Sequence, residues 1–291
     1  ILEKNGLQIT YEPEITPEQI LEKIENFEVV IVRSRTKITK NMIEKATKCQ
    51  IIARVGVGLD NIDQTAAKEK NIRVINAVEG AMNAVAELVI GLMLSLAREI
   101  PRADREVRNG NWIKKELMGS ELRGKYLGIV GLGNIGKRLG RLARALNMNI
   151  IGYDVVPIDE EFSSEVGLMK ADLGTLLASS DYVSLHVPLL DSTKHLINAE
   201  KMSTMKNTSR IINTSRGGVI DEEALYEFLK DGKLGGAALD VFEVEPATSN
   251  NLATLPNFIS TPHMGAQTKE AQSLAANVIA EKIIQILRGV I

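Results

Sequence analysis

Short apolar runs alternate with amphipathic segments along almost the whole chain. In its first part, buried strands are expected at 29–32, 51–53 and 73–75, and helices at 17–26, 39–47 and 62–70. Asp60 and Asn61 are plausible N-caps for the last of these helices. Regular alternation of strand and helix is typical of a parallel sheet with helices on both faces. This part of the chain is therefore expected to be an α/β domain.

A second series of the same kind begins at residue 127. Its expected strands lie at 127–131, 149–153, 182–186, 210–214, 236–241 and 258–261, and its helices include 135–146, 172–179 and 221–230. We expect Asp221 to cap the last helix. A length of 291 residues is sufficient for two such domains.

Two longer helical patterns join the halves, one over about 84–98 and one over 268–288. If the last helix packs on the first domain, the chain crosses between the domains twice. The sequence then predicts a discontinuous domain of residues 1–97 plus 266–291, with a second domain of residues 98–265 inserted into it.

Composition narrows the function classes. Hydrophobic residues make up 44% and charged residues 25%, and the net charge of −2 gives no reason to expect nucleic acid or a membrane as partner. The apolar stretch 84–97 is interrupted by Glu87 and is expected to be too short to span a bilayer. The single cysteine, Cys49, excludes an internal disulfide framework and fits a reducing compartment such as the cytoplasm.

The most specific local pattern is a glycine-rich turn. Gly131, Gly133 and Gly136 follow an apolar run and precede a helical pattern, and Asp154 closes the next strand. This spacing permits a tight turn, close approach of a pyrophosphate and close helix–strand packing, while the helix N-terminus faces the phosphates. Together, the strand, helix and acid favour dinucleotide binding.

Reactive residues follow several later strands. Arg216, Asp240 and His263 come at or just after strand ends, and Glu245 lies on the loop beyond Asp240. Ligands of open α/β sheets bind at the carboxyl ends of the strands, so these side chains are expected at one edge. Histidine can accept the hydroxyl proton when an alcohol is oxidised, a carboxylate can orient it, and arginine can grip a carboxylate. Glu245 alone could equally be a solvated loop acid.

The chain has three histidines, so a choice among them can be argued. His263 has a glycine nearby and an acid upstream, which favours it as the base. We expect His186 to line the cofactor site and His195 to be structural. No metal site is expected.

Longer motifs resemble a known family. Those that carry the resemblance are Gly131–Gly136, Asn213–Gly218, Asp240–Pro246 and Thr261–Gly265. They are similar to the D-isomer-specific 2-hydroxyacid dehydrogenases, in the same order and over essentially the whole chain. The resemblance implies two flavodoxin- or Rossmann-like doubly wound domains, with the cofactor domain inserted into the substrate domain. It also implies a homodimer built largely through the cofactor domains, and Arg216, Glu245 and His263 as catalytic residues.

The resemblance also implies NAD as cofactor. Asp154 would bind the adenosine ribose hydroxyls and disfavour the 2′-phosphate of NADP, since Val155–Pro157 offers no arginine. The expected cofactor-binding residues are Gly131, Gly133, Asn134, Ile135, Gly136, Asp154, His186, Val187, Pro188, Thr214, Ser215, Arg216, Asp240, His263, Gly265 and Ala266.

Within the family, the resemblance is closest to the D-3-phosphoglycerate dehydrogenase branch, through segments 32–36, 54–61 and 266–272. It implies a phosphorylated 2-hydroxy acid as substrate, with Arg33 and Arg54 facing the phosphate. The expected substrate-binding residues are Arg33, Ser34, Arg54, Gly56, Val57, Gly58, Arg216 and His263. Lys114 or Lys115 of a partner subunit could complete the site. For each cation alone, a solvated surface role is an equal alternative.

Other functions stay open at this point. A glyoxylate, hydroxypyruvate or D-lactate dehydrogenase would use the same machinery, and an NAD(H)-sensing corepressor shares the fold. Compared with the family, about 20 residues are expected to be missing before Ile1, on the usual size of a first strand–helix unit. The chain stops after its last helix, so feedback through a C-terminal regulatory domain is not expected.

Overall fold

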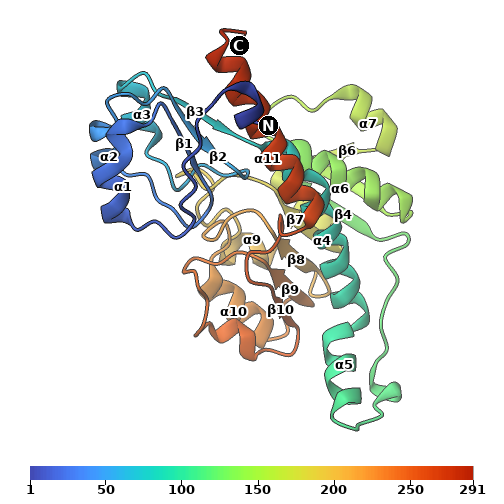
Figure 1. Ribbon diagram of the computed structural model, residues 1–291. Helices are drawn as coiled ribbons and strands as arrows, with labels where there is room; N and C mark the ends of the chain where they lie inside the picture. Colours follow the sequence, from blue (N-terminus) through green and yellow to red (C-terminus); the bar gives the residue numbers. More distant parts are fainter. Residues whose placement is uncertain (291) are drawn as a thin grey trace. The chain divides into compact units, whose positions relative to one another are not determined.

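The computed structural model describes residues 1–290, which fall into two compact units (Figure 1). Unit 1 comprises Ile1–Ala84 and Ala266–Ile291, and unit 2 comprises Val85–Gly265. The first boundary therefore lies earlier than the position after residue 97 at which the sequence analysis placed it. The reason is helix α4 (Val78–Arg98), which runs without a break from one unit into the other.

Unit 1 is built on a three-stranded parallel sheet. The strands are β1 (Val29–Val32), β2 (Ile51–Arg54) and β3 (Arg73–Asn76), in the order β1-β2-β3. The helices are α1 (Pro17–Lys23), α2 (Lys40–Lys45), α3 (Gln64–Glu69) and α11 (Lys269–Leu287), with 3₁₀ turns η1 (Glu3–Asn5) and η2 (Ile24–Asn26). All three predicted strands are confirmed, and so are the three predicted helices, one before β1 and one between each pair of successive strands.

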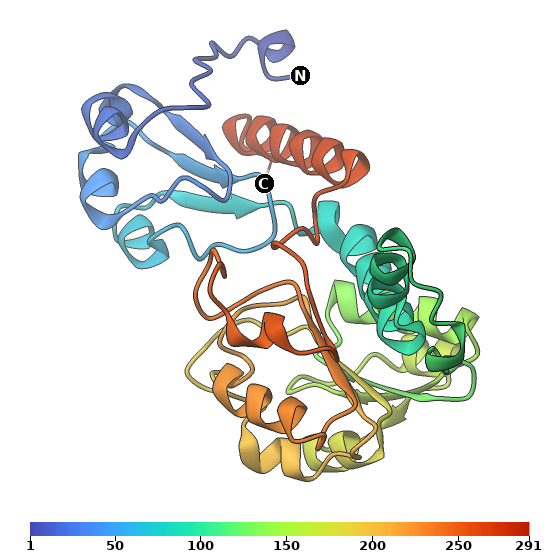
Figure 2. The same cartoon turned by 90° about the horizontal axis from the view of Figure 1, so that it is seen from below.

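Alternate residues of β2 face two separate clusters of buried side chains. Ile52 packs with side chains of α1, α2 and α3, whereas Ile51 and Ala53 pack with Ile279 and Ile283 of α11. Helix α11 thus covers the face of the sheet that α1–α3 leave open (Figure 2). Because side chains alternate across a strand, an all-apolar run such as 51–53 requires helices on both faces.

The predicted N-caps of α3 are wrong. Asp63 caps this helix by accepting the Ala66 N–H at 2.9 Å. The helix starts later than expected because Asp60 and Asn61 form a turn and Ile62 then forms an isolated parallel bridge with Ile38. Asn61 is used differently, since its Nδ2 donates to the Arg33 and Thr36 carbonyls at 3.0 and 2.6 Å.

Unit 2 contains a seven-stranded sheet in which every pair of neighbours is parallel, in the order β10-β9-β8-β7-β4-β5-β6. The strands are β4 (Tyr126–Val130), β5 (Asn149–Tyr153), β6 (Met169–Lys170), β7 (Tyr182–Leu185), β8 (Arg210–Asn213), β9 (Gly236–Leu239) and β10 (Phe258–Ser260). Six of them match the sequence prediction, with ends shifted by a residue or two. The two-residue strand β6 was not predicted, because it is too short to show a pattern.

Helices cover both faces of this sheet. Besides α4, the helices of unit 2 are α5 (Ile100–Arg108), α6 (Asn134–Ala145), α7 (Glu160–Val166), α8 (Leu173–Ser179), α9 (Ala199–Ser203) and α10 (Glu222–Lys230), with 3₁₀ turns η3 (Lys114–Glu116) and η4 (Asn251–Thr254). Side chains of α4, α6 and α7 share one buried cluster with the sheet, and those of α8, α9 and α10 share the other. This is the predicted doubly wound arrangement, and Asp221 caps α10 as expected.

The strand order reverses between β4 and β7, the two neighbours from which the chain winds outward in opposite directions. The turn after β4 lies directly against the segment after β7. A Cβ added to Gly131 would come 2.6 Å from the carbonyl oxygen of His186. Ligands of doubly wound sheets bind outside the carboxyl ends of the strands at such a reversal.

Helix α4 is long and apolar enough to cross a membrane, judged by length and composition only. It extends beyond the stretch 84–97 that the sequence analysis judged too short. Yet Val89 and Met93 are fully buried in the cluster that α4 shares with the sheet of unit 2. A core helix of an α/β domain accounts for these contacts.

The single cysteine is buried next to the first sheet. The Cys49 thiol donates to the Ile51 carbonyl at 3.4 Å, and burial raises the pKa of Cys49 to about 11. Because the thiolate is the reactive form, this environment keeps Cys49 unreactive and fits a structural role.

Candidate active site

The glycine-rich turn leads from β4 into α6. Gly131 has φ 93°, a value that favours glycine, and its N–H donates to the Tyr153 carbonyl at 2.9 Å. Helix α6 begins at Asn134 with Gly133 at the N-cap, and no side chain of the described residues caps it. Its first N–H groups are therefore available to an anionic ligand.

Asp154 contacts this turn directly. One carboxylate oxygen accepts the Leu132 N–H at 2.6 Å, and the other accepts the Val156 N–H at 3.1 Å. The sequence analysis assigned Asp154 only to a ribose. The structure gives it a further role, since it ties the end of β5 to the glycine turn.

The hydroxyl of Thr214, at the end of β8, is buried and has no hydrogen-bond partner among the described residues. Buried hydroxyls are nearly always paired, so a lone one at this sheet edge suits a ligand with a polar group. Within residues 1–290, no group of three or more His, Cys, Asp or Glu side chains could hold a metal ion.

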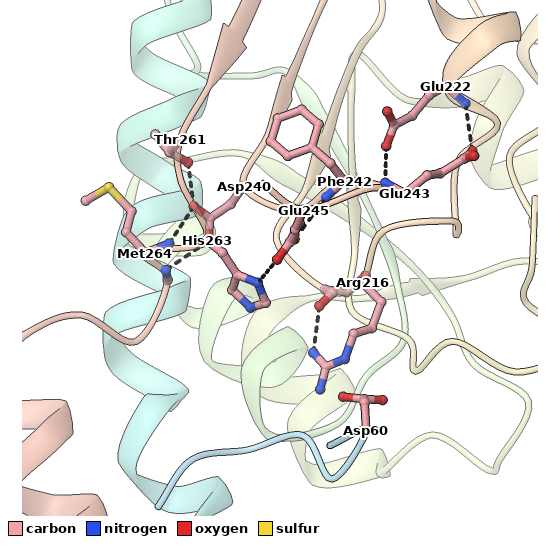
Figure 3. A network of polar contacts seen from close by, with 12 residues as sticks. Asp60, Arg216, Glu222, Asp240, Phe242, Glu243, Glu245, Thr261, His263 and Met264 are labelled. Atoms are coloured by element: carbon pink, nitrogen blue, oxygen red, sulfur yellow. Dashed lines mark hydrogen bonds and ion pairs between the residues drawn. The ribbon is translucent and has the colours of Figure 1, made fainter. Parts of the chain in front are cut away.

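His263 and Glu245 form the central pair of the site (Figure 3). Nδ1 of His263 lies 2.8 Å from Oε2 of Glu245, and both side chains are substantially exposed, at 50% and 38%. Oε1 of Glu245 accepts the Phe242 N–H at 3.1 Å, which fixes the carboxylate at its other oxygen. With Nδ1–H donated to Glu245, Nε2 is the nitrogen that can accept a proton.

Asp240 holds the loop that carries His263. Its buried carboxylate accepts three donors, namely the Thr261 hydroxyl at 2.6 Å and the Met264 and Gly265 N–H groups, each at 2.8 Å (Figure 3). His263 itself has φ 50°, a left-handed conformation that costs an L-residue about 1–2 kcal/mol. Asp240 is predicted from the sequence to bind the cofactor, and its contacts in the structure also position His263.

Side-chain hydrogen bonds to the backbone also hold the turn that carries Arg216. Asn213 is buried, and its Nδ2 donates to the Arg216 carbonyl at 2.9 Å while its Oδ1 accepts the Ser215 N–H at 3.0 Å. Gly217 packs tightly on the Glu245 segment, because a Cβ added there would come 1.8 Å from the Phe242 carbonyl oxygen. The turn with Arg216 and the loop with Glu245 are thus in contact. Asn213 lies in the motif Asn213–Gly218, but its positioning role was missed, since its hydrogen bonds to the turn are seen only in the structure.

The other two histidines are engaged elsewhere. Nε2 of His186 lies 2.9 Å from the Ser184 hydroxyl, and burial lowers the pKa of His186 to about 4. The imidazole of His186 is therefore neutral at pH 7, which suits a lining role and not proton transfer. His195 lies 3.1 Å from Glu243 through its Nε2.

Six of the eight predicted substrate residues lie at the end of, or just after, the strands β1 and β2 of unit 1. Arg33 and Ser34 follow β1 and are exposed. The loop Gly56–Gly58 follows β2. Two side chains hold its backbone, since Arg54 Nη1 donates to the Gly58 carbonyl and Asn76 Nδ2 donates to the Val57 carbonyl. Arg54, assigned to a phosphate by the sequence analysis, thus braces this loop in the structure.

A family profile described as "D-isomer specific 2-hydroxyacid dehydrogenase, NAD binding domain" matches residues 90–265. D-3-phosphoglycerate dehydrogenase of Methanocaldococcus jannaschii is 48% identical over 290 residues, which cover 99% of this chain and 55% of that protein. Hydroxypyruvate reductase of Thermotoga maritima is 46% identical over 290 residues, which cover 99% and 93%. The chain spans about half the length of the D-3-phosphoglycerate dehydrogenases that it matches.

Solved structures agree with this relationship. The D-lactate dehydrogenase of Aquifex aeolicus, solved with NAD and lactic acid, superposes with a TM-score of 0.83 at 31% identity, over 92% of this chain and 85% of that one. The glycine turn, Asp154 and the His263–Glu245 pair lie in the segment that the family profile covers. The chain belongs to the D-isomer specific 2-hydroxyacid dehydrogenase family and contains its NAD-binding domain.

Proposed function

We propose that this chain catalyses the NAD-dependent oxidation of D-3-phosphoglycerate to 3-phosphohydroxypyruvate, the first reaction of serine synthesis, in the cytoplasm. The observation that carries the chemistry is the His263–Glu245 contact at 2.8 Å. Membership of the family supports the 2-hydroxy acid, and the 48% identical D-3-phosphoglycerate dehydrogenase supports the phosphorylated one.

The chain's own residues supply proton transfer and orientation. Nε2 of His263 accepts the proton of the C2 hydroxyl, and Glu245 stabilises the imidazolium that forms. Arg216 binds the substrate carboxylate and polarises the reacting oxygen. NAD, when bound, accepts the hydride from C2.

The turn after β4 fits a dinucleotide. Gly133 is exposed, and a Cβ added to it would meet no atom within 4 Å, so the space above it can hold a pyrophosphate. The uncapped N-terminus of α6 supplies N–H donors and a partial positive charge. Asp154 would bind the ribose hydroxyls and repel a 2′-phosphate, which supports NAD over NADP.

Two glycines of this turn should respond differently to alanine. Gly133→Ala should unfold within about 2 °C of the parent protein yet lose at least roughly tenfold in NADH affinity, because its Cβ occupies only the ligand space. Gly136→Ala should lower both the unfolding temperature and the NADH affinity, since its Cβ would come 2.1 Å from the Gly131 carbonyl oxygen. Thermal unfolding and NADH fluorescence titration measure the two effects.

Gly91→Ala is the matched control for this pair, because Gly91 lies within α4 and a Cβ there meets nothing within 4 Å. It should keep NADH affinity. Unchanged NADH affinity in Gly133→Ala would contradict the assignment of the turn.

His263→Ala should lower kcat by about 10²–10⁴-fold, the usual worth of a positioned acid or base. Steady-state production of NADH at saturating NAD measures it, and NADH titration checks that cofactor binding survives. Turnover within about fivefold of the parent enzyme would remove His263 from the proton-transfer role.

The identity of the substrate rests on the cations of unit 1. Arg33 is exposed after β1, where its guanidinium can bind a phosphate. The hydroxypyruvate reductase relative is almost as similar, at 46% identity, and matches over 93% of its own length. Reduction of hydroxypyruvate or glyoxylate is therefore the second candidate function.

Arg33→Ala should lower kcat/KM for D-3-phosphoglycerate by roughly 10- to 100-fold, the value of a charge-assisted hydrogen bond. It should leave kcat/KM for hydroxypyruvate unchanged. Arg35→Ala is the control, because Arg35 is engaged by Glu14 at 2.7 Å. A higher kcat/KM for unphosphorylated acids in the parent enzyme, or an equal loss on both substrates, would favour the reductase.

We also propose that the chain forms a homodimer through unit 2. Trp112 and Met118 flank η3 and are 81% and 89% exposed, and Val107 at the end of α5 is exposed as well. Neighbouring large apolar side chains left in solvent are typical of a protein–protein interface. Lys114 and Lys115 lie on the same segment, so dimerisation would bring these cations next to the partner chain.

Sedimentation velocity at micromolar concentration should show a dimer that a Trp112→Ala/Met118→Ala variant converts to monomer. Tyr11→Ala is the control, because Tyr11 is 83% exposed but lies in unit 1. A variant that sediments like the parent protein would place the interface elsewhere.

A further inference from the structure

Next to the predicted catalytic residues, unit 2 contains a connected group of three titratable side chains, His195, Glu222 and Glu243. Glu222 is the first residue of α10, and its Oε1 accepts the Glu243 N–H at 2.6 Å. In return, the Glu222 N–H donates to Oε1 of Glu243 at 3.3 Å (Figure 3). Nε2 of His195 lies 3.1 Å from that same oxygen of Glu243.

The carboxylate of Glu222 bridges both ends of one loop. Its Oε1 binds the backbone at Glu243, and its Oε2 accepts Nδ2 of Asn250 at 2.8 Å. The loop between these two anchors carries Glu245. A single side chain on a neighbouring helix therefore fixes where this loop begins and ends.

The location of Glu222 is electrostatically unfavourable. Burial raises the pKa of Glu222, and the neighbouring carboxylates of Glu243 and Glu245 add to the effect. The Glu243 N–H and the Asn250 amide lower it again. A half-buried carboxylate close to two others is costly, and the hydrogen bonds from Glu243 and Asn250 offset part of that cost.

The same group reaches the turn of Arg216. The backbone N–H of His195 donates to the carbonyl of Gly218 at 2.7 Å, and Gly218 lies two residues after Arg216. The His195 side chain then contacts Glu243 at the start of the Glu245 loop. His195 thus connects the turn that carries Arg216 with the loop that carries Glu245.

We propose that Glu222 is a positioning residue for the reaction: by holding both ends of the 243–250 loop, it directs the Glu245 carboxylate at Nδ1 of His263. Glu222 acts through Glu245 and not on the substrate. The proposal rests on the proposed function, because it requires His263 to be the base and Glu245 to be its partner.

The test compares Glu222→Ala and Glu222→Gln with Glu223→Ala, a change at an exposed residue on the same first turn of α10. D-3-phosphoglycerate oxidation is followed by NADH absorbance from pH 6 to 10, together with NADH titration and circular dichroism. Glu222→Ala should lower kcat by roughly 10- to 100-fold, the usual effect of a misplaced catalytic group, while KM and NADH affinity stay within about threefold.

The pH profile provides the readout that a purely structural role would not change. A loosened Glu245 stabilises the imidazolium less, so the acidic limb of kcat/KM should move to lower pH in Glu222→Ala. Glu222→Gln should be folded, with kcat between those of Glu222→Ala and the parent enzyme. Its amide oxygen still accepts a hydrogen bond from the Glu243 N–H, whereas its amide nitrogen cannot accept one from Nδ2 of Asn250. Glu223→Ala should match the parent enzyme in both kcat and pH profile.

Three results would overturn the proposal. The first is a folded Glu222→Ala or Glu222→Gln enzyme with kcat within twofold of Glu223→Ala. The second is a loss of kcat with no shift in the pH profile. The third is a parent enzyme that fails to reduce NAD with any 2-hydroxy acid tested. Only the third result also removes the proposed function, so the two failures are distinguishable.

Discussion

The parallel alignment of the seven strands of unit 2 is the constraint on which the site depends. Every neighbouring pair runs the same way, so the chain leaves each strand at the same edge of the sheet. The glycine turn follows β4, Asp154 follows β5, Arg216 follows β8 and His263 follows β10. Residues spread over more than a hundred positions of sequence are collected at one edge by hydrogen bonding between backbones alone.

Side chains then refine what the sheet collects. Asp240 accepts hydrogen bonds from the backbone of the loop after β10, and Asp154 accepts one from the turn after β4. Asn213 donates to the backbone of the turn after its own strand, β8. Such bonds hold irregular backbone in one conformation, including the left-handed conformation of His263. The residues expected to touch the ligand are therefore supported by a set of buried or half-buried polar residues that need not touch it.

Sequence patterns predicted the sheet well because strand and helix periodicities are local. The strands at 51–53 and 182–186 and the glycine turn were all found in this way. The strand β6 was missed, since two residues show no periodicity, and the helices α7 and α9 were missed as well. The positioning roles of Asp240, Asn213 and Glu222 were also missed. Each depends on a partner brought close only by the fold, as when Glu222 meets Glu243 and Asn250.

The discontinuous first unit has a consequence for the order in which the chain is made. The face of the first sheet formed by Ile51 and Ala53 is covered by α11, and α11 follows all of unit 2 in the sequence. Domains generally fold as units during synthesis, starting from the N-terminus. Here the N-terminal sheet keeps an apolar face uncovered while all of unit 2 is being translated. The first sheet is thus synthesised before unit 2 but completes its core only after unit 2 has been made, and during that interval its open face is a surface for chaperones to protect.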